Sequence, residues 1–185
     1  MDNGARSYHR FLEGDKSGLE ELVEMYNDNL IFFLNGYVNN ITVAEDLAAE
    51  TFFEIMVHKN HFKEIFSFKT WLFKVGRNNA IDYLRKQSRT RLTPIEDVKN
   101  ELLDKCNLED IILKDERKRR IHNALHMINA DYQDAIYLVY FEDMSYDEAA
   151  VVLKKNTKQI KNLTYRAKQA LKAVLEKEDF FDERF

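Results

Sequence analysis

The chain has 185 residues, of which 45% are hydrophobic and 32% are charged, and its net charge is −4. This length suits one domain or two small ones, and the composition excludes a disordered polymer because it supplies enough apolar residues for a core. One proline and five glycines leave few signals for the tight turns of an all-β fold, so we expect an all-α protein. The single cysteine, Cys106, excludes an internal disulfide and a four-cysteine zinc site.

Basic residues are concentrated in two segments of this acidic chain. Residues 67–91 carry seven lysines and arginines against one aspartate, and residues 154–175 carry seven against no acid. Two such segments indicate two contacts with a polyanion such as nucleic acid, although solvated helix faces remain an alternative. The first residues lack a secretion signal and no stretch is long and apolar enough to cross a bilayer, so we expect a cytoplasmic protein without direct membrane insertion.

The first half of the chain is predicted to be helical. Apolar residues recur at three- and four-residue steps from Leu19 to Tyr37, which predicts one long helix. Thr42 and Glu45 have the spacing of a capping box, which would open a second helix. Carboxylates four residues apart on that helix cost about 0.2–0.5 kcal/mol per pair in isolation, which indicates a basic partner unless solvation alone accounts for them. These carboxylates are Asp46, Glu50 and Glu54.

The first basic segment is predicted to form a further helix after a loop over residues 58–66. Ser67 can cap this helix, and Phe68, Trp71 and Leu72 begin its apolar face. Rings next to cations suit single-stranded nucleic acid, because bases stack on the rings while the cations hold phosphates. The ordinary alternative is that the rings belong to the core. The polar and basic residues on the remaining surface are Arg77, Asn78, Arg85, Lys86 and Arg89.

The second half begins after residues 93–107, which hold the only proline and are expected to link two helical domains. Helical periodicity resumes over residues 108–128 and 132–140. A capping box at Ser145 and Glu148 then opens a short helix, residues 154–156 break it, and Asn156 and Gln159 can cap a second helix. Such a pair is a helix-turn-helix whose second helix is sized for a major groove. Its outward-facing residues are Lys158, Gln159, Lys161, Asn162, Tyr165 and Arg166.

These stretches together resemble a bacterial sigma factor of the extracytoplasmic-function (ECF) group, within the sigma-70 superfamily. Residues 44–52 (AEDLAAETF) resemble the region-two helix that grips the polymerase clamp. Residues 67–86, with Trp71 and the Arg-Asn pair at 77–78, resemble the element that melts and reads the −10 promoter box. Residues 140–168 resemble region four, which reads the −35 box. The resemblance implies region two over residues 1–91, a linker over 92–107 and region four over 108–185.

The resemblance also implies partners and contact residues. The protein would be a transcription initiation factor and not an enzyme, without cofactor or metal. It would bind core RNA polymerase (the clamp helices of the largest subunit and the flap), promoter DNA and an anti-sigma factor. The implied polymerase contacts are Asp46, Glu50 and Glu54. The implied −10 contacts are Lys63, Glu64, Phe66, Lys69, Lys74, Arg77, Asn78, Arg85 and Lys86. The implied −35 contacts are Lys158, Gln159, Lys161, Asn162, Tyr165, Arg166 and Lys168.

The chain departs from the family pattern in the turn of the helix-turn-helix. Lys154 stands where a glycine is common, and a left-handed lysine there would cost about 1–2 kcal/mol. Leu163 stands where a basic residue is frequent, which removes one phosphate contact.

Three other classes of function remain as alternatives. A helix-turn-helix repressor would bind promoter duplex without polymerase. A helical interaction module would show no salt-dependent binding to DNA. An enzyme or metal protein would rest on the histidine pairs His58 and His61, or His122 and His126, which lack the HExxH pattern of a zinc hydrolase.

Overall fold

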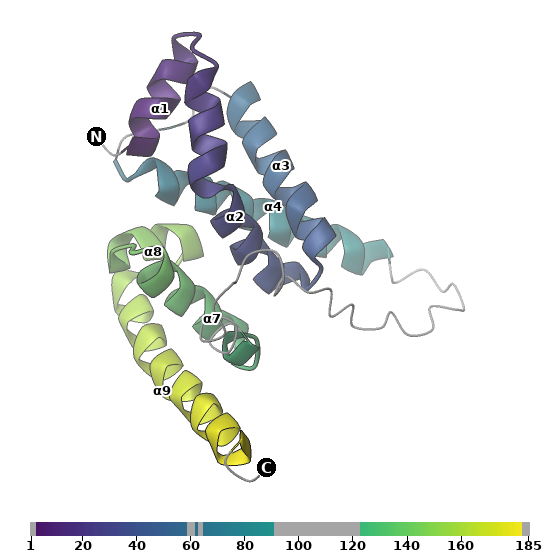
Figure 1. The fold of residues 1–185 in the computed structure, drawn as a ribbon, viewed down its shortest axis with the longest axis vertical. Helices are drawn as coiled ribbons and strands as arrows, with labels where there is room; N and C mark the ends of the chain where they lie inside the picture. The colour runs from purple at the N-terminus through teal and green to yellow at the C-terminus, as the bar shows by residue number, and fades with distance from the viewer. Residues whose placement is uncertain (1–2, 59–61, 63–64, 91–122, 183–185) are drawn as a thin grey trace. The chain divides into compact units, whose positions relative to one another are not determined.

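The computed structural model describes residues 3–58, 62, 65–90 and 123–182 (Figure 1). Within these residues every regular element is a helix, and the chain divides into two compact units, Met1–Leu108 and Glu109–Phe185. The predicted all-α fold with two small helical domains is therefore confirmed. The predicted linker over residues 92–107 lies outside the described residues.

In the part of the first unit that the structure describes, four helices surround one core. They are α1 (Asn3–Leu12), α2 (Ser17–Val38), α3 (Ile41–Val57) and α4 (Phe68–Thr90). The long helix α2 packs against the other three, and α4 crosses behind it in the view of Figure 1. The apolar stripe that predicted α2 supplies the centre of this core, because its leucines Leu22, Leu30 and Leu34 are fully buried.

A glycine and a threonine let α4 approach the two helices that it crosses. A Cβ atom at Gly76 of α4 would lie 2.9 Å from Leu30 Cδ1, so any side chain there would require the Leu30 side chain to move. Beside it, the buried hydroxyl of Thr51 donates to the Leu47 carbonyl at 2.7 Å and accepts from Asn79 Nδ2 at 3.2 Å. A side-chain hydrogen bond therefore joins α3 to α4 in the core.

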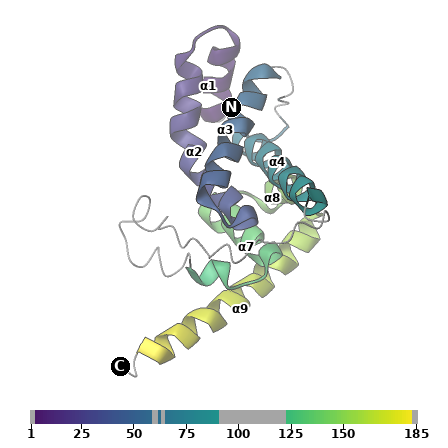
Figure 2. The same ribbon diagram turned by 90° about the vertical axis from the view of Figure 1, so that its right-hand side faces the viewer.

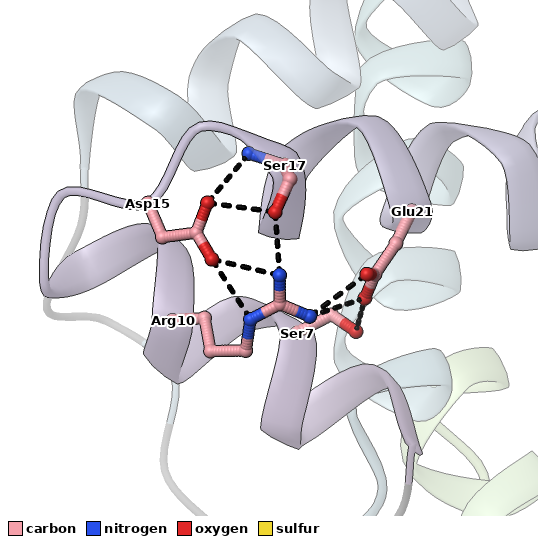
Figure 3. A network of polar contacts seen from close by, with 5 residues as sticks. All are labelled: Ser7, Arg10, Asp15, Ser17 and Glu21. Atoms are coloured by element: carbon pink, nitrogen blue, oxygen red, sulfur yellow. Dashed lines mark hydrogen bonds and ion pairs between the residues drawn. The ribbon is translucent and has the colours of Figure 1, made fainter.

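The corner between α1 and α2 is fixed by a network of polar side chains (Figure 3). Arg10 donates to both oxygens of Glu21 at 2.8 and 2.9 Å and to Asp15 Oδ2, and Ser7 donates to Glu21 Oε2. The hydrogen bonds from Arg10 and then Ser7 hold the pKa of Glu21 below its usual value. Ser17 completes the corner through its hydroxyl and backbone amide, which both bind Asp15.

The helix starts of the first unit agree with the sequence at one place and differ at another. The Ser67 hydroxyl accepts from the Thr70 amide at 3.2 Å, so the predicted cap of α4 is confirmed. The capping box predicted at Thr42 is wrong: the N-cap of α3 is Asn40, whose side chain accepts from the Val43 amide at 3.1 Å. Because the left-handed Asn39 ends α2 and the extended Asn40 follows at once, α3 begins at Ile41, ahead of Thr42.

Over residues 130–182 of the second unit, the structure has three α-helices and one turn of π-helix. They are α7 (Ala130–Ile136), the π-helix η1 (Tyr137–Phe141), α8 (Tyr146–Leu153) and α9 (Thr157–Asp182). The sequence predicted a helix over residues 132–140, and the structure divides this helix between α7 and η1. The Glu142 amide donates to the Tyr137 carbonyl five residues back, and the wider turn buries both Tyr137 and Leu138.

The predicted helix-turn-helix is confirmed in its caps and its turn. Ser145 and Glu148 form the expected capping box at the start of α8. At the start of α9, Asn156 Oδ1 accepts from the Gln159 amide and Gln159 Oε1 accepts from the Asn156 amide, both at 2.8 Å. Between the helices, Lys154 has φ 53° and ψ 43°, the left-handed conformation that favours glycine.

Helix α9 is much longer than its contacts with the rest of the second unit require. Its first turns pack against α7 and α8, with Ile160 and Ala167 fully buried, and Leu171 continues the apolar face. Beyond this contact the helix extends past α7 and α8 (Figures 1 and 2). The early part of α9, residues 157–168, is therefore the part that the fold positions most firmly.

The backbone of Lys154 yields a stability prediction. Replacing Lys154 with glycine should raise the free energy of unfolding by about 1 kcal/mol, because glycine adopts the left-handed conformation without a Cβ penalty. Lys154→Ala is the matched control, since it removes the same side chain but keeps Cβ, and it should bring no comparable gain. Urea unfolding of the second unit, followed by circular dichroism, measures the difference. Equal stabilities of the glycine and alanine variants would contradict the strain.

Candidate functional site

The first candidate surface lies on α3 and combines acidic with apolar side chains. Asp46 and Glu50 are exposed, as the sequence predicted for a surface stripe, while Glu54 is half-buried. No lysine or arginine occurs anywhere from residue 17 to residue 57, so neither α2 nor α3 supplies a cation to neutralise them. This surface therefore favours a basic partner.

Two large apolar residues extend the same stripe of α3, and sequence reasoning missed them. Phe53 is 61% exposed and Val57 is 55% exposed. Residues 46, 50, 53 and 57 are spaced by four, three and four, which places all of them on one helix face. The signal in the sequence was weak, because Phe53 follows the buried Phe52 and an adjacent pair of rings does not show which one faces the core. We call Asp46, Glu50, Phe53 and Val57 the α3 surface.

The second candidate surface lies on α4, where only some of the expected residues share a face. Lys74, Asn78 and Arg85 are spaced by four and seven residues and form one stripe, with Arg85 exposed. Arg77 instead donates to the Tyr37 hydroxyl of α2 at 3.1 Å, and its guanidinium lies 6.0 Å from that ring. Arg77 thus joins α4 to α2. The expected contacts Lys63 and Glu64 lie outside the described residues, and Lys69 and Lys86 lie away from the stripe by spacing.

The aromatic residues around the start of α4 divide between core and surface. Phe68 and Phe73 are fully buried and Trp71 is half-buried, so the core interpretation holds for the first two. Immediately before the capping Ser67, however, Ile65 is 75% exposed and Phe66 is 37% exposed. Exposed apolar side chains beside a basic helix can stack on an unpaired base.

The third candidate surface is the outward face of α9. All seven residues expected there are exposed, opposite the buried Ile160 and Ala167; they are Lys158, Gln159, Lys161, Asn162, Tyr165, Arg166 and Lys168. An open hollow of about 210 Å³ lies on this face, lined by Lys155, Gln159, Asn162, Leu163 and Arg166. Its polar groups include amides that can both donate and accept, which direct contact with base edges requires.

Two lysines of α9 each contact the ring of a tyrosine. Lys168 Nζ lies 4.3 Å from the ring centroid of Tyr140, and Lys161 Nζ lies 5.8 Å from that of Tyr146. Hydrogen bonds from Lys168 and then from Tyr146 lower the pKa of Tyr140, because they stabilise its phenolate. The sequence did not reveal these pairs, since they join residues more than ten positions apart. Lys161 and Lys168 are therefore oriented by the fold as well as exposed.

The histidine pairs do not build a metal site in the part of the chain that is described. Among the described residues, no group of three histidine, cysteine, aspartate or glutamate side chains is placed to hold a metal ion. His61 and His122 themselves lie outside those residues. No described helix combines the length and the apolar character needed to cross a membrane.

The contact between Tyr140 and Lys168 yields a pH prediction. The ammonium stabilises the phenolate, so Tyr140 should ionise below the usual tyrosine range. Lys168→Met should return this ionisation to higher pH, whereas Lys172→Met, farther along α9, should leave it unchanged. Absorbance of tyrosinate during a pH titration, with Tyr140→Phe to assign the signal, measures the effect. If Tyr140 ionises at the same pH in Lys168→Met as in the wild type, the contact is refuted.

Comparisons with known proteins agree with this arrangement. Residues 22–90 match the family model of sigma-70 region 2, and residues 118–171 match that of sigma-70 region 4. The chain is 28% identical to the ECF RNA polymerase sigma factor SigM of Bacillus subtilis over 156 residues, covering 84% of this chain and 94% of SigM. It is 31% identical to the sigma factor SigV of the same organism over 143 residues, covering 77% of this chain and 82% of SigV.

A solved structure shows the same fold. The sigma factor RpoE of Bartonella quintana, crystallised with the anti-sigma factor NepR, aligns with a TM-score of 0.66 at 24% identity, over 85% of this chain and 96% of RpoE. The acidic α3, the basic α4 and the helix-turn-helix thus fall within two matched regions, in the order expected from the sequence. The chain belongs to the ECF group of the sigma-70 family: it is an RNA polymerase sigma factor, a transcription initiation factor and not an enzyme.

Proposed function

We propose that this chain binds core RNA polymerase through the α3 surface and directs it to promoters by reading a −35 duplex with α9 and melting and reading the −10 element with α4. The observation that carries the proposal is the separation of charge among exposed faces. The α3 surface carries carboxylates and apolar side chains, whereas the exposed faces of α4 and α9 carry cations. One face suits a basic protein surface, and the other two suit nucleic acid.

The polymerase contact is proposed to combine an apolar anchor with acidic neighbours. Aromatic residues in the middle of an interface often supply most of its binding free energy, while charges around them favour the correct partner. Phe53 is the only ring of the α3 surface, and Glu50 and Asp46 lie on the same face one and two turns before it, respectively. The occupant is inferred to be the clamp helices of the largest subunit, and Glu54 would contribute from the edge of this face.

The −10 contact is proposed to use Phe66 together with the basic face of α4. Lys74, Asn78 and Arg85 can hold the backbone of a separated strand, because cations and amides contact phosphates without regard to sequence. Phe66 can stack on a base that has left the duplex, and such stacking offsets part of the cost of unstacking. The remaining members of the proposed −10 set are Lys63, Glu64, Lys69, Arg77 and Lys86.

The −35 contact is proposed to use the first turns of α9 in the major groove. Residues near the start of a recognition helix reach base edges, and later ones more often reach phosphates. Lys158 and Asn162 are therefore assigned to bases, together with Gln159, whose Oε1 accepts from the Asn156 amide and leaves its NH₂ to donate. Lys168, which Tyr140 orients, is assigned to a phosphate. The remaining contacts proposed are Lys161, Tyr165 and Arg166.

An anti-sigma factor and the polymerase flap are proposed as further partners. The solved RpoE is bound to an anti-sigma factor, and the acidic and apolar α3 surface suits a basic, amphipathic partner segment. In the second unit, Met127 is 67% exposed and Phe141 is 46% exposed, which offers apolar area for the flap.

The proposed function is tested by reconstitution. The chain should co-purify with bacterial core polymerase, and the complex should start run-off transcription at defined sites on genomic fragments, whereas core alone should not. A helix-turn-helix repressor would instead bind promoter duplex tightly without polymerase. Tight duplex binding by the chain alone, together with no transcription from the mixture, would overturn the proposal.

Charge reversal on α3 tests the polymerase contact. Asp46→Lys combined with Glu50→Lys should weaken core binding by about tenfold or more, because two attractive charges become repulsive. Glu45→Lys is the matched control, since residue 45 is exposed on the same helix but lies off the face of residues 46, 50, 53 and 57. A fluorescence-anisotropy titration with core polymerase measures the affinities. The assignment fails if Glu45→Lys weakens core binding as much as the double variant does, or if neither variant weakens it.

Substitutions along α9 test the division between bases and phosphates. Lys158→Ala or Asn162→Ala should change preference among −35 sequences by about 1–3 kcal/mol per lost contact. Lys172, farther along α9, is assigned to a phosphate like Lys168, so Lys172→Ala should weaken all sequences alike and reduce the slope of log affinity against log salt by about 0.9, the value for one phosphate. Holoenzyme binding to a library of −35 variants at several salt concentrations measures both effects. Identical behaviour of Lys158→Ala and Lys172→Ala would show that the helix docks differently.

A further inference from the structure

Tyr8 of α1 contacts the end of α3, the start of α4, and Phe62 in the segment between these two helices. Its hydroxyl donates to the Ile55 carbonyl in the last turn of α3, at 3.5 Å. Its ring meets that of Phe62 edge-on, with centroids 5.8 Å apart. It also lies 5.2 Å from the ring of Phe68 and 5.5 Å from that of Trp71, both in the first turn of α4. Tyr8 itself is fully buried.

These rings form a closed cluster around Phe62. The Phe62 ring lies 5.7 Å from Phe68 and 5.4 Å from Trp71, and Phe68 lies 5.7 Å from Trp71. All these separations fall in the range of about 4.5–7 Å at which aromatic pairs attract. Phe62 is therefore held by three rings, one of which comes from α1 and two from α4.

The hydroxyl of Tyr8 adds a polar contact at the end of α3. The last carbonyls of a helix have no partner within it, and Ile55 belongs to that last turn. Burial raises the pKa of Tyr8 to about 12, so the hydroxyl stays protonated and remains a donor at physiological pH. One side chain thus meets both the end of α3 and the start of α4.

The exposed Ile65 and Phe66 lie between two anchored points. Phe62, three residues before Ile65, is held in the aromatic cluster, and Ser67, next to Phe66, caps α4 through the Thr70 amide. A site that captures an unpaired base must be held in place before the base arrives, since a loosely supported site loses specificity.

We infer that Tyr8 is a positioning residue for the −10 contact: through Ile55, Phe62 and Trp71 it fixes the place at which Ile65 and Phe66 meet an unpaired base. This inference rests on the proposed function, because it takes the exposed pair to face promoter DNA. It assigns a role to α1, which lies before the residues 22–90 that match region 2. Tyr8 does not touch the DNA; it acts through Phe62.

The test compares holoenzymes that carry Tyr8→Leu, Phe62→Leu or both. Each single substitution should slow promoter opening, followed by permanganate reactivity, by about tenfold, because a displaced site captures the base less often. The double variant should lose no more than either single variant, because both substitutions break the same contact. Tyr8→Phe keeps the ring and should retain most of the opening rate. Affinity for core polymerase should stay unchanged in all four.

A second readout separates positioning from mere loss of stability. On a pre-melted promoter, the wild-type holoenzyme should prefer the selected −10 base over a substituted one, and Tyr8→Leu should abolish that preference. Leu30→Ala is the control, since it truncates the core of the same unit against Gly76, away from the aromatic cluster, and it should leave the preference intact.

Distinct results would overturn the inference and the proposed function. If Tyr8→Leu keeps the preference for the −10 base, or if Leu30→Ala loses it equally, Tyr8 is not a positioning residue. Should Tyr8→Leu fail to fold, Phe62→Leu decides the matter, because a wild-type preference in that variant also refutes the inference. If the wild-type holoenzyme opens no promoter at all, the proposed function itself is wrong.

Discussion

Separation of charge along the chain is the constraint on which the rest of the structure depends. Residues 17–57, which span α2 and α3, carry eight carboxylates and no lysine or arginine, whereas α4 and the first turns of α9 are rich in cations. Like charges on packed helices repel one another, so this distribution opposes folding of the first unit. The same distribution leaves an acidic face and basic faces ready for partners of opposite sign.

The core of the first unit offsets this repulsion through close approach of its helices. Gly76 lets α4 reach Leu30 of α2, and Thr51 links α3 to Asn79 of α4 by a partly buried hydrogen bond. At the corner between α1 and α2, Arg10 of α1 binds Glu21 and so supplies a cation. Helices α2 and α3 have no cation of their own. Packing in the core and the cation from α1 therefore hold α2 and α3 in place. The exposed acids of the α3 surface stay available for a partner.

The sequence predicted those elements whose determinants are local. Hydrophobic periodicity was sufficient for α2, and paired caps at Ser145 and Asn156 were sufficient for the helix-turn-helix. Prediction from the local sequence failed where two nearby residues could each cap a helix, as at α3, where Asn40 rather than Thr42 is the N-cap. It also could not find contacts between distant residues, such as Tyr140 with Lys168, or decide which of two adjacent rings faces outward, as with Phe53. These depend on packing that periodicity does not encode.

The central claim is that the acidic and basic faces meet different partners, and site-specific photo-crosslinking tests it most directly. Phe53 and Tyr165 are exposed rings, at 61% and 66%, so a photoreactive benzoylphenylalanine can replace either with little change in shape. In one assembled complex of core polymerase, this chain and promoter DNA, the probe at position 53 should crosslink to the largest polymerase subunit and the probe at position 165 to DNA. Crosslinking of position 53 to DNA, or of position 165 to polymerase alone, would contradict the account.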